Sequence, residues 1–156
     1  MPQPTEAFSY SHDDTGLIEQ PIGYWSWAAH IAVVTHIRAG LAGFGLSQPQ
    51  WWVLNQAAGD GRSREEITSI LKGYLDVGDA LQPDIDSLLE RGLIAPGPTG
   101  LLRRTTEGED LYVKARAKQR EMRRTIHDGI DDEEFLTTMK VLQRMIHNTG
   151  GKAWHH

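Results

Sequence analysis

The chain contains no cysteine among its 156 residues. Disulfides, thiolate zinc sites and a thiol redox switch are therefore excluded, and this composition fits a cytoplasmic protein. No apolar run approaches the roughly 20 residues that a helix needs to cross a bilayer. The first residues are polar and acidic, not basic and then apolar. We therefore expect neither a membrane span nor a signal peptide.

The chain also lacks an excess of basic residues. Its 16 Lys and Arg stand against 21 Asp and Glu, which gives a net charge of −5, so no global positive field indicates a nucleic-acid partner. The first twenty residues contain acids but no Lys or Arg, and the remainder is close to neutral. We interpret residues 1–20 as a partly disordered arm that could order against a partner subunit, and residues 152–156 as a flexible tail.

Motifs for catalysis and for metal binding are missing as well. The sequence has no P-loop, no G-x-S-x-G and no dinucleotide-binding fingerprint, so we expect no enzyme activity and no cofactor. His30 and His36 are six residues apart, which does not place them one turn apart on a helix face, and no metal site is expected. The acidic run from Asp131 to Glu134 is better explained as the start of a helix, where its dipole favours acids.

The stretch from Ile85 to Gly108, IDSLLERGLIAPGPTGLLRRTTEG, organises the rest of the chain. Its apolar residues at helical spacing end at Gly92, which can adopt the left-handed conformation that closes a helix. A short apolar run at 93–95 suits a strand, residues 96–100 are a dense turn signal, and residues 101–105 form a returning strand with a basic end. A new helix then begins at Thr105 or Thr106 with acids in its first turn. Helix, strand, turn, strand and helix is the order of a winged helix.

Further helices are predicted on both sides of this stretch. A long helix is expected over residues 21–42, with Pro21 in its first turn. Ser47 is the expected N-cap of a second helix, and Ser63 with Glu66 forms the capping box of a third. The fourth, the recognition helix, is expected from about Pro83 to Arg91, with one further turn of helix possible before it from Val77. The last two are expected over residues 106–129 and 131–149.

The order and spacing of these segments resemble the MarR family of dimeric bacterial transcriptional regulators. The resemblance rests on LLERGLI, the hairpin and T-x-x-G at the start of a long helix, and it covers roughly Pro21 to Gly151. It implies a mainly α-helical winged helix-turn-helix with a small β-hairpin wing, dimerised through its N- and C-terminal helices. The dimerisation helices would be about 21–42 and 109–149, and the DNA-binding lobe about 47–108.

The resemblance also implies a partner, which is double-stranded DNA with a pseudo-palindromic operator. A homodimer would place the fourth helix of each subunit in the major groove and the wing near the minor groove. The polar and basic residues around these elements are the candidate DNA contacts: Arg62, Ser63, Arg64, Gln82, Ser87, Arg103 and Arg104. Gln82 and Pro83 stand where the family usually has Thr and Arg.

Aromatic residues gather in the first two helices. In the family, these helices line a crevice that binds small aromatic or phenolic ligands, and the ligand releases DNA. Trp25, His30, Trp51 and Trp52 are the candidate pocket residues. The alternative for each Trp is packing in the core or at the dimer interface, since Trp buries a large area.

The sequence therefore predicts a ligand-responsive, DNA-binding repressor. A second hypothesis is a winged-helix dimer that has lost DNA readout and serves as a small-molecule- or protein-binding module. Its support is the acidic character of the recognition region, in which Asp76, Asp79, Asp84 and Asp86 would repel phosphates.

Overall fold

A computed structural model describes residues 7–74 and 81–153. The chain divides into two compact units, Met1–Thr35 and His36–His156, which are described separately. The predicted turn of helix from Val77, together with Asp76 and Asp79, lies outside the described residues.

The first unit contains a short helix and most of a long one. Helix α1 (Asp14–Ile18) is one that the sequence did not predict, and it begins where the Asp13 carboxylate accepts a hydrogen bond from the Gly16 N–H. Helix α2 (Ile22–Ala42) agrees with the predicted first long helix, and its last residues belong to the second unit. Leu41 is its one buried side chain.

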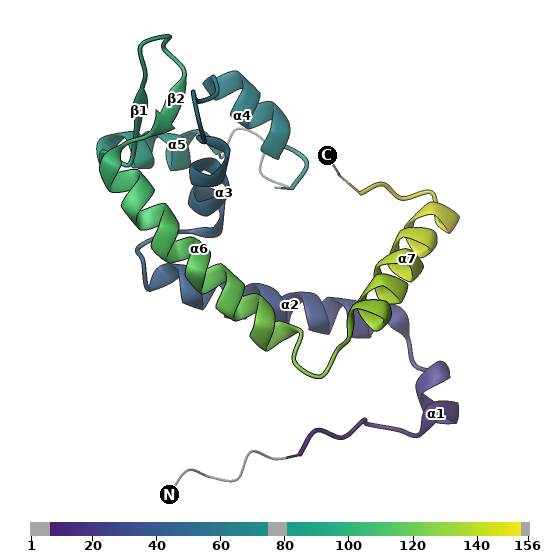
Figure 1. Ribbon diagram of the computed structural model, residues 1–156. Helices are drawn as coiled ribbons and strands as arrows, with labels where there is room; N and C mark the ends of the chain where they lie inside the picture. Colours follow the sequence, from purple (N-terminus) through teal and green to yellow (C-terminus); the bar gives the residue numbers. More distant parts are fainter. Residues whose placement is uncertain (1–6, 75–80, 154–156) are drawn as a thin grey trace, which may run out of the picture. The chain divides into compact units, whose positions relative to one another are not determined.

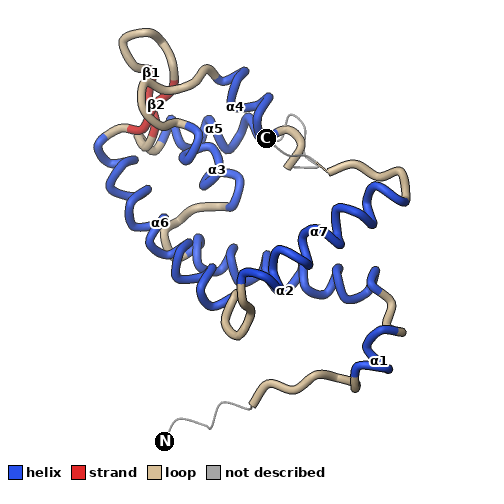
Figure 2. The backbone as a smooth tube through the Cα atoms, turned by 45° about the vertical axis from the view of Figure 1, so that its right-hand side comes forward, coloured by secondary structure: helices blue, strands red, loops and turns tan. Residues whose placement is uncertain are grey.

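The second unit contains the predicted winged helix. Three short helices, α3 (Gln48–Gln56), α4 (Arg64–Leu71) and α5 (Leu81–Glu90), pack together, and the hairpin of β1 (Ile94–Pro96) and β2 (Leu102–Arg104) lies beside them (Figure 1). Two longer helices follow, α6 (Thr106–Ile126) and α7 (Asp132–Asn148). The two strands are the only ones among the described residues, as the tube drawing shows (Figure 2).

The predicted helix starts are confirmed by their hydrogen bonds. Ser47 and Ser63 each accept a bond from the backbone N–H three residues later, and Gln50 and Glu66 return the bond to complete two capping boxes. The described part of the recognition helix α5 runs from Leu81 and includes the predicted first-turn Pro83, and the residues directly before Leu81 lie outside the description. Proline is tolerated in the first turn of a helix because the first N–H groups have no intrahelical partner.

The core of the second unit is formed where α3, α4, α5 and the hairpin meet. Leu54, Ile67, Ile85, Leu88 and Ile94 are each at most 1% exposed. Burying five such side chains stabilises the fold by about 1.5–3 kcal/mol each. This apolar cluster holds the surface residues of the lobe in place.

Gly92 and Gly108 explain why the hairpin has a fixed position against α6. Gly92 has φ +69°, and its N–H and that of Leu93 bond to the carbonyls of Leu89 and Leu88 to end α5. A Cβ at Gly108 would overlap the Leu93 carbonyl oxygen. The Thr105 hydroxyl donates to the Gly92 carbonyl at 2.6 Å and accepts from the Gly108 N–H at 3.0 Å. The T-x-x-G motif therefore ends in glycine because the backbone of α6 lies against the Leu93 carbonyl, where a side chain at position 108 would not fit.

Candidate nucleic-acid interface

Arg64 is the first residue of α4, directly after the capping residue Ser63. Its guanidinium donates to the Gln82 Oε1 at 2.9 Å and to the Asp86 Oδ1 at 2.8 Å, both on α5. The Arg64 side chain is 34% exposed and that of Asp86 is 57% exposed. The two predicted DNA residues Arg64 and Gln82 are thus brought together, with Asp86 as a third member that the sequence analysis had not selected.

Two more polar contacts fix α5 against its neighbours. The Gln82 Nε2 donates to the Thr68 hydroxyl on α4 at 3.0 Å, and the Gln50 Nε2 on α3 donates to the Ser87 hydroxyl at 3.3 Å. Gln82 and Ser87 are half-buried. These contacts hold the two predicted DNA residues in defined positions and use part of their hydrogen-bonding capacity.

Asp84 lies on the side of α5 that faces the start of α3. The Ser47 hydroxyl donates to the Asp84 Oδ1 at 3.4 Å. Burial raises the pKa of the Asp84 carboxyl above its ordinary value, and the Ser47 hydrogen bond opposes this rise. Asp84 is therefore an inward-facing acid and adds less to phosphate repulsion than its place in the sequence suggested.

The outer face of α5 is formed by three exposed residues at helical spacing, Pro83, Asp86 and Glu90. Arg91, just after the helix, donates from its guanidinium to the Gly45 carbonyl at 2.9 Å. Arg64 of α4 brings a cation to this face through its ion pair with Asp86. This face therefore consists of a proline, two carboxylates and the guanidinium of Arg64, and not of a row of Arg and Lys side chains.

The wing is a two-stranded hairpin to which a third segment is bonded. Ile94 pairs with Arg104 and Pro96 with Leu102. Arg62 forms an isolated antiparallel bridge with Leu102, through two backbone hydrogen bonds of 3.0 and 2.8 Å. Arg62 is itself exposed and joins the wing to the start of α4.

Arg103 and Arg104 are neighbours in β2 but differ completely in environment. Arg103 is exposed and extends across Gly97 in the wing turn, where its Nε lies 3.0 Å from the position of a Cβ at that glycine. The Arg104 side chain is only 10% exposed. The sequence placed both arginines at the strand base, and the structure shows that Arg103 reaches toward the turn.

The guanidinium of Arg104 is engaged within the protein. It donates to the Leu54 carbonyl at 2.7 Å and to the Glu109 Oε2 at 2.7 Å, and its Cζ lies 3.8 Å from the centre of the Tyr112 ring. Trp51 stacks on the ring of Tyr112, with the two ring centroids 5.3 Å apart and the ring planes 12° from parallel. Arg104 thereby connects the wing to α3 and α6, and its predicted DNA contact stays a prediction.

The candidate ligand residues are divided between the two units. Trp51 and Trp52 lie on α3 in the second unit, where Trp52 has the ring of Tyr74 at 5.7 Å. Trp25 and His30 lie in the first unit, both exposed. Trp25 donates to the Gln20 Oε1 at 3.3 Å and lines a hollow of about 430 Å³ with Phe8 and Tyr10. A crevice that needs all four residues stays a prediction.

A separate hollow of about 510 Å³ lies within the second unit, between the end of α2 and the middle of α6. His36, Phe44, Lys118 and Met122 are among the residues that line it. The sequence analysis did not select these residues, because they come from segments about 80 residues apart, with no shared motif to join them.

The part of the chain that the structure describes contains neither a cluster of metal ligands nor a helix that could span a membrane. Across residues 7–74 and 81–153, no three His, Asp or Glu side chains gather as metal ligands would. In the same ranges, none of the helices has the length and apolar character needed to cross a membrane.

Comparison with solved structures identifies this arrangement. A MarR-family transcriptional regulator from Rhodococcus sp. RHA1 is 24% identical, with a TM-score of 0.63 over 80% of this chain and 91% of that one. A MarR family protein of Mycobacterium tuberculosis in complex with DNA is 19% identical, with a TM-score of 0.62 over 81% and 98% of the two chains. This chain has the MarR winged-helix fold.

A third solved structure adds a ligand-bound example of the MarR fold. CouR from Rhodococcus jostii RHA1, bound to p-coumaroyl-CoA, is 23% identical, with a TM-score of 0.65 over 82% of this chain and 93% of that one. No protein-family model and no curated protein matches the chain. The likeness to MarR proteins is therefore carried by the fold, and the residues that perform the function must be argued from this chain.

Proposed function

We propose that this MarR-fold chain is a sequence-specific, DNA-binding transcriptional regulator that acts as a homodimer in the cytoplasm and is not an enzyme. The observation that carries the proposal is the arrangement of α4, α5 and the β1–β2 hairpin, which form a helix-turn-helix and its wing. The solved Mycobacterium tuberculosis protein with this fold is in complex with DNA. The alternative, a dimer that has lost DNA readout, is not favoured by that comparison.

The proposed DNA contacts follow from the geometry of the lobe. Helix α5 would enter the major groove, with Gln82 and Ser87 near base edges, and the exposed Arg62 and Arg103 would contact phosphates. The capped start of α4, with Ser63 and Arg64, presents backbone N–H groups and a cation, a combination that suits a phosphate. The sequence predicts that Arg104 also contacts DNA, but its internal contacts support a different role, and we propose that it holds the wing against α3 and α6.

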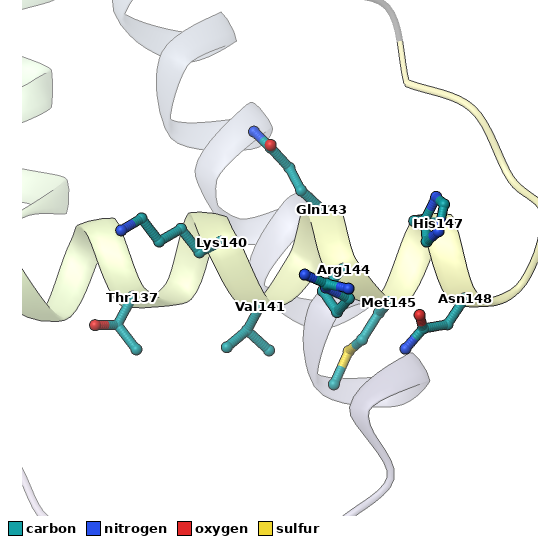
Figure 3. Close-up of a pocket in the computed structure, with 8 residues that line it drawn as sticks. All are labelled: Thr137, Lys140, Val141, Gln143, Arg144, Met145, His147 and Asn148. Atoms are coloured by element: carbon teal, nitrogen blue, oxygen red, sulfur yellow. The ribbon is translucent and has the colours of Figure 1, made fainter.

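The proposed homodimer is supported by apolar surface on α7. No side chain of this helix is buried, and four of its large apolar side chains are 38–53% exposed: Leu136, Met139, Val141 and Met145. Figure 3 shows Val141 and Met145 projecting from the same side of α7. At 100° per residue, Leu136 and Met139 lie on a different side of α7 from Val141 and Met145, so large apolar side chains are exposed around much of the helix. Apolar surface of this extent usually marks a place where a partner binds. A second subunit, held by helices of about 21–42 and 109–149, is that partner.

The proposed effector is a small aromatic or phenolic molecule, and the regulator is a repressor. CouR, which shares the fold, was solved with p-coumaroyl-CoA, a phenolic thioester. In this chain the proposed crevice contains Trp25, His30, Trp51 and Trp52. The ligand would favour a dimer geometry in which the two lobes no longer match the operator, which is a shift between two populations.

The experiment that tests DNA binding is fluorescence anisotropy with DNA from upstream of the protein's own coding region, at several salt concentrations. Competitor-resistant binding that weakens with salt is expected, and the slope counts the phosphate contacts. If the operator lies elsewhere in the genome, selection of binding sites from random DNA with the same protein would still identify its sequence. Binding no tighter than to random DNA, together with no selected sequence, would contradict the proposal.

The effector is tested by titrating the intrinsic Trp fluorescence with small phenols and aromatic carboxylates. Quenching or a shift of the emission is expected for a bound ligand, with Trp51→Phe and Trp52→Phe reducing it. An unchanged spectrum across the whole panel would contradict the aromatic crevice and leave the DNA-binding proposal standing.

A further inference from the structure

The outer face of α5 offers few groups that can read a base. Pro83 has no polar side-chain atom. The Gln82 side chain donates to Thr68 and accepts from Arg64, and the Ser87 hydroxyl accepts from Gln50. Asp86, one turn beyond Gln82, is 57% exposed and is the most accessible of these polar groups. Glu90 is also exposed but is the last residue of the helix, whereas base edges are contacted mainly from the N-terminal part of a recognition helix. Asp86 is therefore the better placed of the two carboxylates to meet a base edge.

The chemistry of a carboxylate limits which base it can meet. An ionised carboxylate only accepts hydrogen bonds. In the major groove cytosine presents an N4 amino donor, guanine presents two acceptors, thymine an acceptor and a methyl group, and adenine an acceptor beside its donor. Cytosine is the one base whose major-groove edge offers a donor without a neighbouring acceptor that would repel the carboxylate.

Arg64 removes the main objection to an acid in the groove. Its guanidinium donates to the Asp86 Oδ1 at 2.8 Å and to Gln82 at 2.9 Å, so it offsets the charge of the carboxylate and fixes its direction. The Oδ2 atom and the remaining lone pairs of Asp86 stay available as acceptors. The pair is formed between two helices, α4 and α5, that the apolar core already holds together.

We propose that Asp86 is a specificity-determining residue that selects cytosine at one position in each half-site, and that Arg64 is its positioning residue. This inference rests on the proposed function, since it assigns a base preference to the DNA-binding lobe. It also explains why the helix functions without the Thr and Arg that the family usually has at the positions of Gln82 and Pro83.

The test is selection from random DNA with the full-length wild-type protein, Asp86→Asn, Asp86→Ala and Glu90→Gln. The wild type is expected to select one cytosine per half-site that Asp86→Asn changes to adenine, because an amide side chain matches the adenine edge. At that position the preference should change by roughly tenfold in measured affinity. Asp86→Ala should lose the preference without gaining another.

Glu90→Gln is the matched control. It removes an exposed acid one turn further along the same helix, so it reproduces the change in charge without the change at Asp86. Binding to every DNA can become tighter in both variants, since each removes a negative charge, but only the Asp86 variants should change the selected base. An equal change of base with Glu90→Gln would overturn the assignment.

Arg64→Lys tests the positioning role. Lysine keeps the charge but loses the planar fork that contacts both Asp86 and Gln82. The cytosine preference should fall several-fold while the salt dependence of binding stays the same. If Asp86→Asn and Arg64→Lys select the wild-type sequence, the inference is wrong and the proposed function stands. If the wild type selects no sequence, the proposed function fails and the inference fails with it.

Discussion

Replacing Arg104 with methionine tests which of two proposed roles this arginine has, stabilising the wing or binding DNA. Methionine keeps the apolar stem over Tyr112 and removes the guanidinium. The hydrogen bond to the Leu54 carbonyl, 2.7 Å long and charge-assisted, is lost together with the contact over the Tyr112 ring and the ion pair with Glu109. The neighbouring Arg103→Met makes the same chemical change on an exposed side chain.

The expected loss of stability follows from these contacts. A hydrogen bond from a charged donor contributes about 1.5–3 kcal/mol, the cation–π contact about 1 kcal/mol, and the ion pair with the 53% exposed Glu109 about 0–1 kcal/mol. With part recovered by the methionine stem, Arg104→Met should destabilise the fold by roughly 3 kcal/mol. For a chain of this size that lowers the melting temperature by about 6–12 °C.

Thermal melting followed by circular dichroism measures the difference, at one fixed protein concentration because the proposed subunit association would contribute to stability. Arg103→Met should melt within about 2 °C of the wild type, since surface substitutions usually change stability by no more than ~0.5 kcal/mol. Equal melting temperatures for the two variants, or a larger drop for Arg103→Met, would refute the structural assignment of Arg104.

The same two variants report on DNA. Each phosphate contact contributes about 0.9 to the slope of log affinity against log salt. Arg103→Met should reduce that slope by about one, and Arg104→Met should leave it unchanged at a temperature where both variants are folded. A reduced slope for Arg104→Met alone would show that Arg104 leaves its internal contacts to bind phosphate.

Three other changes test separate parts of the structure. Gly108→Ala would force a methyl group against the Leu93 carbonyl and should destabilise by about 3 kcal/mol, whereas Gly23→Ala, a helical site with nothing within 4 Å, should be neutral or stabilising in melts. Asp84→Asn should have nearly the same stability as the wild type at low pH and become the more stable of the two as pH rises. The pKa of Asp84 is raised in the folded state, so the folded wild type binds a proton more tightly than the unfolded chain, and that stabilisation is lost once pH passes the folded pKa. A stability difference that stays constant in urea melts from pH 3 to 7 would contradict this reasoning. Val141→Glu on α7 should shift the protein from dimer to monomer in analytical ultracentrifugation, and an unchanged dimer would remove α7 from the interface.

The parts of the fold that sequence predicted are those that depend on near neighbours. The capping boxes at Ser47 and Ser63 join residues three positions apart, and the end of α5 at Gly92 depends on one left-handed residue. Such contacts require no knowledge of the rest of the chain. The prediction that α5 begins at about Pro83 agrees with the described helix to within two residues, and the residues directly before Leu81 lie outside the description.

The contacts that decide the candidate interface join residues far apart in the chain. Arg64 lies 22 residues from Asp86, and Arg104 lies 50 residues from the Leu54 carbonyl. Nothing in the local pattern distinguishes Arg104 from Arg103, since both are basic residues in one strand. Their environments differ because strand residues alternate in direction, and Arg104 is the one that turns toward α3 and α6.

The acidic recognition helix acquires a different meaning once its residues are placed. Counted from the sequence, Asp84 and Asp86 are two equivalent negative charges that oppose DNA. In the fold Asp84 turns inward to Ser47, while Asp86 turns outward and is paired with Arg64. An acid that is exposed and paired with a cation from a neighbouring helix costs little in phosphate repulsion, which is the condition that the proposed base selectivity of Asp86 requires. Net charge along a helix is therefore a poor guide to DNA readout unless each charge is assigned to a face and to a partner.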